Sequence, residues 1–270
     1  MTDTAPSPTE LVTAVPGLAR YLRPATLLHP YAAPDAEVFG SRIGGPALWP
    51  AGEPWPHCTA RHPDDDHRIP RMPPEERAAP TALIPIAQLR AEDAPHLPWP
   101  QNTDLLQVLW CPNDHDDIQG ERYYYGPAVG LHWRRAAELA PATPPPPLRS
   151  EEDYYLPQPC ALRPEQVLDL PDRDELPEEL NRAVAEFAER RGIEHERDPG
   201  RAEGWKAGGW PSWHSTDLIP IDCDCGARMT HLLTMESGDD PGLSLGRYGE
   251  LHVFVCPVDL AHPVGLDIQG

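Results

Sequence analysis

Apolar residues recur at helical spacing in two segments of the chain. The first predicts an amphipathic helix over residues 8–22, which Pro16 must shorten or kink because proline interrupts helical hydrogen bonding. The second covers residues 177–192, where glutamates follow Pro177, arginines precede Gly192, and apolar side chains repeat every three or four positions. We expect this second segment to be the clearest helix of the protein.

Shorter apolar runs predict strands. Residues 105–110 and 251–255 are rich in apolar, β-branched and aromatic side chains, and each run ends just before a cysteine followed by a proline. Both are therefore expected to be buried strands with a cysteine at the exit. Residues 81–86 predict another strand, followed by a short helix around residues 87–92.

The two buried strands belong to a longer repeat. Residues 106–114 and 251–259 are identical at five of nine positions, and each copy follows a segment with two consecutive glycines and a tryptophan, at 42–49 and 206–213. Such self-similarity predicts two similar halves packed together. A Pro-x-Cys or Pro-x-x-Cys element follows each glycine segment, at 56–58 and 220–223.

A proline run at residues 141–147 separates the two copies and is typical of a stiff spacer. We therefore expect an N-terminal helical extension over residues 1–37 and a first repeat over 38–140. A Pro-rich linker with an acidic helix would cover 141–203. The second repeat would cover 204–270 and pack with the first as one unit.

The charge balance limits the partners. The chain has 22 basic and 43 acidic residues, a formal net charge of −21, which disfavours nucleic acid and anionic membranes and favours neutral or basic partners. Lys206 is the only lysine, which we interpret as a bias of composition without mechanistic meaning. The N-terminal residues lack the pattern of a signal peptide, and no apolar run approaches the length of a membrane span. We expect a cytoplasmic protein.

Cysteine spacing supplies the sharpest candidate for chemistry. Cys223 and Cys225 flank one residue before a glycine, and Cys256 follows a predicted strand. Three thiolates brought together would suit structural zinc, with His262 or Asp259 as fourth ligand. The alternative is that these cysteines are small buried residues at a turn.

The first half has fewer candidate ligands. It retains Cys58 and Cys111, with His57, Asp114 and His115 nearby, so a second metal there is the less favoured hypothesis.

The tryptophans beside the paired glycines are candidates for ligand contact. Glycines permit close backbone approach, and large flanking aromatic rings can grip an extended peptide. The alternative is a turn whose tryptophans fill the core. The candidate binding residues are Trp49, Trp55, Trp210, Trp213, Gly208 and Gly209.

Several sequence signatures of common enzymes are absent. There is no Gly-x-Gly-x-x-Gly, no phosphate loop and no His-Glu-x-x-His. The acidic and histidine-containing stretches at residues 64–67 and 113–117 are interpreted as solvated loops. An enzyme is therefore unsupported by motif, although a cleft crowded with His57, His67, His115 and carboxylates would favour one.

The assembled motifs resemble the YwqG-like family of unknown function, over most of residues 38–134 and 204–269. The matching segments are 39–46, 49–50, 55–56 and 83–89 in the first half, and 208–213, 223–233, 245–249 and 253–256 in the second. The second-half pattern is also similar to the programmed cell death protein two family, whose eukaryotic members act as chaperones for a ribosomal protein. Such families commonly carry a fourth cysteine where this chain has Asp259.

The resemblance implies an α+β fold with two β-rich halves related by pseudo-twofold symmetry and short helices outside. It brings no catalytic activity. Our leading hypothesis is a non-enzymatic, cytoplasmic protein-binding module, a chaperone or an inhibitor of a basic partner, and an open groove lined by tryptophan would favour it. The alternative is a hydrolase or transferase with its site in the cleft between the repeats.

Overall fold

The computed structural model describes residues 6–46, 48–59, 80–116, 124–141, 153–193 and 199–270. Its helical segments are α1 (Pro8–Ala14) and α3 (Glu178–Arg191), with 3-10 helices η1 (Pro16–Tyr21), η2 (Ala136–Glu138), η3 (Asp153–Tyr155) and η4 (Arg173–Glu175). Its strands are β1 (Arg23–Leu27), β2 (Tyr31–Ala32), β3 (Arg42–Ile43), β4 (Leu48–Pro50), β5 (Ile84–Arg90), β6 (Leu105–Trp110), β7 (Val129–Arg134), β8 (Leu139–Pro141), β9 (Cys160–Ala161), β10 (Glu165–Asp169), β11 (Lys206–Gly208), β12 (Thr230–Glu236), β13 (Glu250–Val255) and β14 (Gly265–Gln269).

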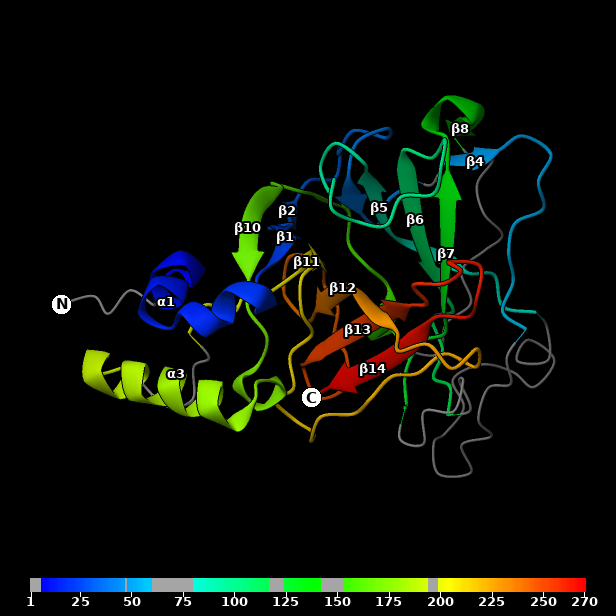
Figure 1. The fold of residues 1–270 in the computed structure, drawn as a ribbon. Coiled ribbons are helices and arrows are strands. Elements are labelled where there is room, and N and C mark those ends of the chain that lie inside the picture. Colours follow the sequence, from blue (N-terminus) through cyan, green and yellow to red (C-terminus); the bar gives the residue numbers. More distant parts are fainter. Residues whose placement is uncertain (1–5, 47, 60–79, 117–123, 142–152, 194–198) are drawn as a thin grey trace.

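Most strands join one of two antiparallel sheets (Figure 1). Among the described residues, sheet A has the order β10-β1-β11-β12-β13-β14 and sheet B the order β2-β9-β3-β5-β6-β7, while β4 and β8 form a separate pair. The fold is thus mostly β-sheet with few short helices, consistent with the predicted α+β class. None of the helices in the described ranges has the length and apolar composition needed to cross a membrane.

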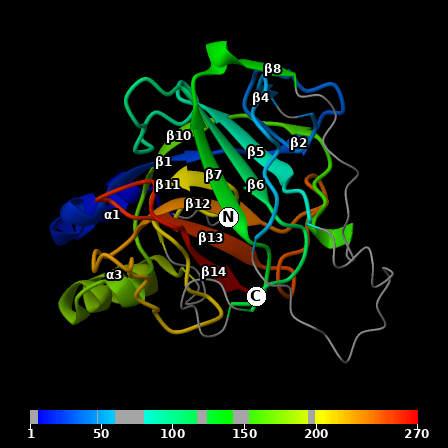
Figure 2. The ribbon, with the colours of Figure 1, turned by 90° about the vertical axis from the view of Figure 1, so that its right-hand side faces the viewer.

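The two sheets face each other across one apolar core (Figure 2). Side chains of β5 and β6 from sheet B and of β12 and β13 from sheet A belong to the same buried cluster. Strands β6 and β13 are buried along their whole length, as the apolar runs at 105–110 and 251–255 predicted. Burial on both faces explains why apolar residues occur on both faces of each strand.

The helices form a smaller cluster beside the β10 edge of sheet A (Figure 1). Helix α1 starts with a capping box between Ser7 and Glu10, ends before Pro16, and continues as η1, so the predicted interruption is confirmed. Helix α3 ends at Gly192, whose φ of 69° allows the left-handed cap, and it buries Val184 and Phe187 against α1. The predicted acidic helix is confirmed as well.

Three expectations about secondary structure differ from the structure or fall outside the described residues. The short helix predicted around residues 87–92 is wrong, because β5 continues to Arg90 and pairs with β6 throughout. The segment 1–37 contributes strands β1 and β2 in addition to helices, and 141–203 contributes β9 and β10. The loop around residues 64–67 and most of the proline run at 141–147 lie outside the described residues.

The paired glycines form tight turns at the ends of β3 and β11. All four have positive φ, between 60° and 75°. A Cβ atom on Gly45 would lie 2.7 Å from a guanidinium nitrogen of Arg42, and one on Gly209 would overlap the carboxylate of Asp169. Both the dihedral angle and the lack of space require glycine at these two positions.

A buried ion pair anchors the second of these turns. The ammonium of Lys206 lies 2.9 Å from a carboxylate oxygen of Asp169, with 2% and 0% of the side chains exposed, and it also donates to the carbonyl of Ala202. Asp169 accepts two further hydrogen bonds, from the backbone N–H groups of Ala202 and Trp210. One carboxylate therefore ties β10 to β11 and to the loops on both sides of β11.

Replacing Lys206 should destabilise the fold strongly. We expect Lys206→Met to cost about 3 kcal/mol of unfolding free energy, because it leaves the Asp169 charge buried with only backbone donors. The matched control is Arg135→Met, which breaks an exposed ion pair with Glu138 and should change stability by less than about 0.5 kcal/mol. Urea unfolding of both variants measures the difference. Equal stabilities would show that the buried pair does not have this role.

Candidate functional site

The cysteines of the second half lie on a tight turn between β11 and β12. The carbonyl of Cys223 accepts a hydrogen bond from the N–H of Gly226, whose φ is 85°, and the turn is closed by a second bond from Cys223 N–H to Ala227. This geometry presents the side chains of Cys223 and Cys225 from one short loop. Cys256, directly after β13, and His262, in the loop before β14, approach from the other side.

The four side chains converge on one point. Their ligand atoms all lie within 4.8 Å of one another, with Cys225 Sγ 3.5 Å from Cys256 Sγ and Cys223 Sγ 3.4 Å from His262 Nδ1. Tetrahedral zinc, with its usual bond lengths, separates two sulfurs by about 3.8 Å and a sulfur from a nitrogen by about 3.6 Å. The cluster could thus hold a metal ion with little movement.

Asp259 lies behind the cluster and does not belong to it. Its carboxylate is 4.0 Å from Nε2 of His262, the nitrogen that faces away from the cysteines. A carboxylate that accepts a hydrogen bond from that nitrogen commonly orients a metal-binding histidine, but a separation of 4.0 Å is longer than a hydrogen bond. Of the two predicted fourth ligands, the structure therefore brings His262 to the cysteines.

The cluster favours a thiolate at Cys256. Burial alone would raise the pKa of this thiol, but backbone hydrogen bonds from Asp259 and Val258 and contacts with His262 and Cys225 lower it to about 6. Beneath the cluster a small apolar core contains Ile221, Met229 and Phe254. Contacts between thiols and apolar packing therefore together attach the turn at 223–226 to sheet A.

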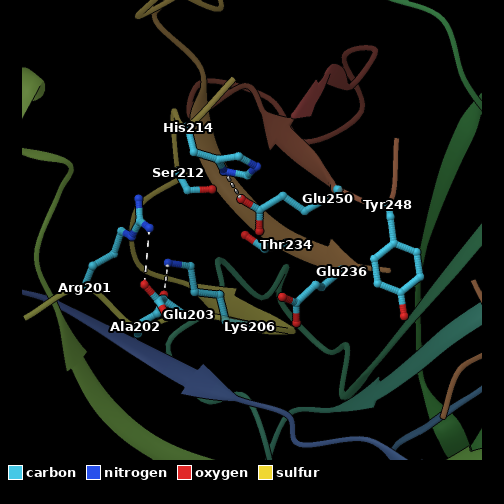
Figure 3. A pocket seen from close by; sticks show the side chains of 12 residues that line it. Arg201, Ala202, Glu203, Lys206, Ser212, His214, Thr234, Glu236, Tyr248 and Glu250 are labelled. Atoms are coloured by element: carbon cyan, nitrogen blue, oxygen red, sulfur yellow. Dashed lines mark hydrogen bonds and ion pairs between the residues drawn. The ribbon is translucent and has the colours of Figure 1, made fainter. Parts of the chain in front are cut away.

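A cavity of about 160 Å³ lies on the outer face of sheet A, away from the shared core (Figure 3). Its lining comes from segments 201–206 and 212–214 and from the neighbouring ends of β12 and β13. The charged and hydroxyl-bearing residues that line it are Arg201, Glu203, Lys206, Ser212, His214, Thr234, Glu236, Tyr248 and Glu250.

The cations of this cavity already have anionic partners. Lys206 is bound to Asp169, and Arg201 lies 3.6 Å from Asp172 and 3.3 Å from Glu203. Figure 3 shows Glu236 and Tyr248 on the side away from Arg201. The pKa of Glu236 is raised, first by partial burial and then by the carboxylates of Glu250 and Glu203. The negative charge of the cavity is therefore concentrated near Glu236.

Glu250 is the buried carboxylate of the cavity. His214 lies 3.3 Å and His252 3.5 Å from its Oε1 atom. Burial would raise its pKa, but these histidines and Lys206 lower it overall. Glu250 is thus held ionised at the cavity wall.

A chain of hydrogen bonds runs from the cavity into sheet A. Nδ1 of His231 lies 3.1 Å from the Gly208 carbonyl and must donate to it, so Nε2 of this neutral ring accepts from the Thr234 hydroxyl at 3.0 Å. Thr234 then accepts from Nδ1 of His252 at 3.1 Å. In a neutral His252 ring, Nε2 is left to accept the hydroxyl proton of Ser212, 3.2 Å away.

The same chain determines protonation at its inner end. Burial lowers the pKa of His231 well below its ordinary value, with the nearby His252 and Lys206 acting in the same direction. His231 is therefore neutral, and the directions of the hydrogen bonds from Gly208 as far as Nδ1 of His252 follow from it.

The four candidate tryptophans make internal hydrogen bonds or packing contacts. Trp49 is 5% exposed, and the indole N–H groups of Trp55, Trp210 and Trp213 donate to Leu83, Tyr21 and Glu175. Trp213 also stacks on Phe254. None of the four lines the cavity, although Ser212 and His214 of the same segment do. Direct contact of these tryptophans, or of Gly208 and Gly209, with a ligand stays a prediction.

The structure describes two of the three histidines that were proposed to crowd an inter-repeat cleft. His57 is exposed and bonds to the carbonyl of Trp55, His115 is fully buried beside Cys58, and His67 falls outside the described residues. Asp114 accepts hydrogen bonds from Tyr154 and Tyr155.

Sequence reasoning missed the cavity because its residues are dispersed. Its members carry no motif and come from several segments between residues 201 and 250. One signal was available: Glu250 and His252 alternate with apolar residues in a strand predicted to be buried, and buried ionisable groups often mark functional sites.

Residues 41–263 match the model of a domain of unknown function, DUF1963. The chain therefore belongs to this family, for which YwqG-like is the family name. A comparison with curated proteins finds no match. The similarity of the second half to programmed cell death protein two stays a prediction.

Proposed function

We propose that this chain is a non-enzymatic, cytoplasmic binding module that receives a basic group of a protein partner in the cavity beside Glu236 and Glu250. The observation that carries the proposal is that both cations of the cavity are neutralised internally while Glu236 is held close to two other carboxylates. The net charge of −21 supports a basic partner and argues against nucleic acid or an anionic membrane. None of the six cysteines, all of which lie in the described ranges, forms a disulfide, which is typical of a reducing compartment.

We further propose that the two halves arose as an internal duplication with pseudo-twofold symmetry. Strands β3-β5-β6-β7 of sheet B have the same order as β11-β12-β13-β14 of sheet A. The register shifts after Pro85 in one sheet and after His231 in the other, near the start of β5 and of β12. Cys111 follows β6 as Cys256 follows β13. A shared bulge and shared strand exits support a common origin for the two units.

We propose zinc as the ion of the second-half cluster. Three thiolates and one imidazole form a donor set that zinc prefers, and the set fills all four tetrahedral positions. A closed set of this kind is structural, so the ion would hold the turn at 223–226 against the end of β13.

Removing two of these ligands should remove one metal ion. We expect Cys223→Ser/Cys225→Ser to lose about one zinc per chain relative to the unmodified protein, when both are purified without chelator. Elemental analysis measures the stoichiometry. Cys160→Ser is the matched control, because Cys160 is buried and belongs to neither cysteine cluster. An unchanged zinc content in the double variant would exclude this site.

The size of the cavity restricts what it can bind. Pockets for drug-sized ligands enclose roughly 300–1,000 Å³. This cavity of about 160 Å³ is smaller and suits the head of one side chain. An ammonium or guanidinium group placed beside Glu236 and Glu250 would relieve the repulsion between these carboxylates. Trp210 and Trp213 would then contribute indirectly, by fixing the segment that carries Ser212 and His214.

A lysine analogue tests this proposal. Nα-acetyl-lysine methylamide should bind with a Kd of about 1 mM in an NMR titration, and Glu236→Gln should weaken binding about tenfold. Binding should also weaken with salt and as the pH falls, because Glu236 has a raised pKa and is protonated earlier than an ordinary glutamate.

Two controls accompany the titration. Glu189→Gln removes an exposed carboxylate on α3 and should leave binding unchanged. The norleucine analogue has a similar shape without the charge and should not bind. Equal binding of the two analogues, or full affinity in Glu236→Gln, would contradict the proposed recognition.

A second candidate function is hydrolysis, favoured by the hydrogen bond from Ser212 to His252. A serine hydroxyl within hydrogen-bond distance of an imidazole nitrogen beside a cavity, as Ser212 Oγ is at 3.2 Å from Nε2 of His252, is the arrangement of a nucleophile and its base. The third group differs from a Ser-His-Asp triad, since Nδ1 of His252 donates to the Thr234 hydroxyl. Such an enzyme would work inside the second half and not between the repeats.

Covalent labelling distinguishes the two candidates. A hydrolase should react with a fluorophosphonate at Ser212, and Ser212→Ala should abolish the labelling seen by mass spectrometry while the nearby exposed Ser215→Ala leaves it intact. A binding module should show no labelling above that of a surface serine.

A further inference from the structure

The first half also gathers metal-binding side chains. The ligand atoms of Cys58, Cys111 and His115 lie within 4.8 Å of one another, and Cys58 Sγ is 3.3 Å from His115 Nε2. Zinc with one thiolate and one imidazole ligand places this sulfur and nitrogen about 3.6 Å apart. Three donors thus meet at a distance that a single ion can bridge.

Each ligand is held by backbone pairing. The N–H of Cys58 donates to Thr81, and that of Cys111 donates to Ala128, which extends the pairing of β6 with β7. His115 is bridged to Gly126 by hydrogen bonds in both directions. Two chain segments, one with Cys58 and one with Cys111 and His115, therefore deliver the three ligands, and backbone hydrogen bonds hold each of these residues in place.

The orientation of His115 is that of a metal ligand. Its Nδ1 lies 3.2 Å from the carbonyl of Gly126, which can only accept, so Nδ1 carries the proton of the neutral ring. The lone pair of Nε2 then points toward Cys58. A backbone carbonyl that fixes the tautomer in this way is a common outer partner of metal-binding histidines. The ring is fully buried, so water does not compete for this nitrogen.

From this geometry we infer that Cys58, Cys111 and His115 bind a second zinc ion in the first half, independent of the cluster at Cys223. Two thiolates and an imidazole suit zinc better than the hard cations Mg²⁺ and Ca²⁺, which prefer oxygen. The thiols release their protons to solvent as the ion binds. Three donors fill three tetrahedral positions, and the fourth takes water or one more donor.

The site differs from that of the second half in what it can do. The second-half cluster supplies four protein donors, whereas the described residues of the first half supply three. Zinc with three protein ligands and one exchangeable ligand is the pattern of sites that bind small molecules or activate water. An exogenous ligand can therefore bind the first-half ion where water, and not a further donor of the chain, holds the fourth position.

Cobalt substitution tests the inference on the full chain. The Cys223→Ser/Cys225→Ser variant leaves the first-half cluster intact and should bind about one Co²⁺ per chain, with thiolate-to-cobalt charge-transfer absorption. Adding Cys58→Ser should abolish this absorption, and adding Cys160→Ser should preserve it. Imidazole at millimolar concentration should shift the spectrum of the first-half ion, because it occupies the exchangeable position.

The result also separates the two metal sites. Loss of all bound metal from the Cys223→Ser/Cys225→Ser variant, with circular dichroism showing that it is folded, would overturn the first-half site. Retention of the cobalt absorption after Cys58→Ser is added would overturn it as well. If this variant binds metal but contains as much zinc as the unmodified protein, only the second-half site is rejected.

Discussion

The carboxylate of Asp169 is the point on which the second half depends. It binds the ammonium of Lys206 and two backbone N–H groups, and it occupies the space that a side chain at position 209 would need. A charge this deeply buried is tolerated only when it is paired and fully hydrogen-bonded. This carboxylate therefore fixes three features together: the glycine turn, the start of the loop that lines the cavity, and the edge of sheet A. The chain's single lysine, which its composition made easy to dismiss, is at the centre of this arrangement.

One face of strand β13 connects the cavity to the cysteine cluster of the second half. Because side chains alternate, Glu250, His252, Phe254 and Cys256 share the outer face of the strand and its exit, over about 20 Å. Glu250 lines the cavity and His252 belongs to the hydrogen-bond chain. Phe254 belongs to the small apolar core and Cys256 to the cysteine cluster. The corresponding residues of β6 in the proposed duplication are Leu105, Gln107, Leu109 and Cys111. Only the cysteine is kept, which explains why the described cavity lies in the second half while both halves carry a thiol cluster.

The sequence predicted those features whose signals lie within a few neighbouring residues. Helix α3 and strands β6 and β13 were predictable because caps and apolar runs lie within a few residues of each other. The convergence of Cys223, Cys225, Cys256 and His262 was predictable because a tight turn and a strand exit restrict where thiols can point. The partners of Trp213, Lys206 and Ser212 were not predictable, because each depends on a residue at least 37 positions away. For the same reason the tryptophan segments could not be assigned to the core or to a ligand from sequence alone.

The positions of β1 and β9 decide whether the halves can act separately. Strand β1 lies between β10 and β11 in sheet A, and β9 lies between β2 and β3 in sheet B. Each short segment, 23–32 and 160–169, supplies one strand to each sheet, so neither sheet is complete without chain from before and after the proline run at 141–147. Separation would expose unpaired strand edges as well as the shared core. The protein should therefore unfold as one cooperative unit. An ion bound in either half would then stabilise the whole native state by mass action.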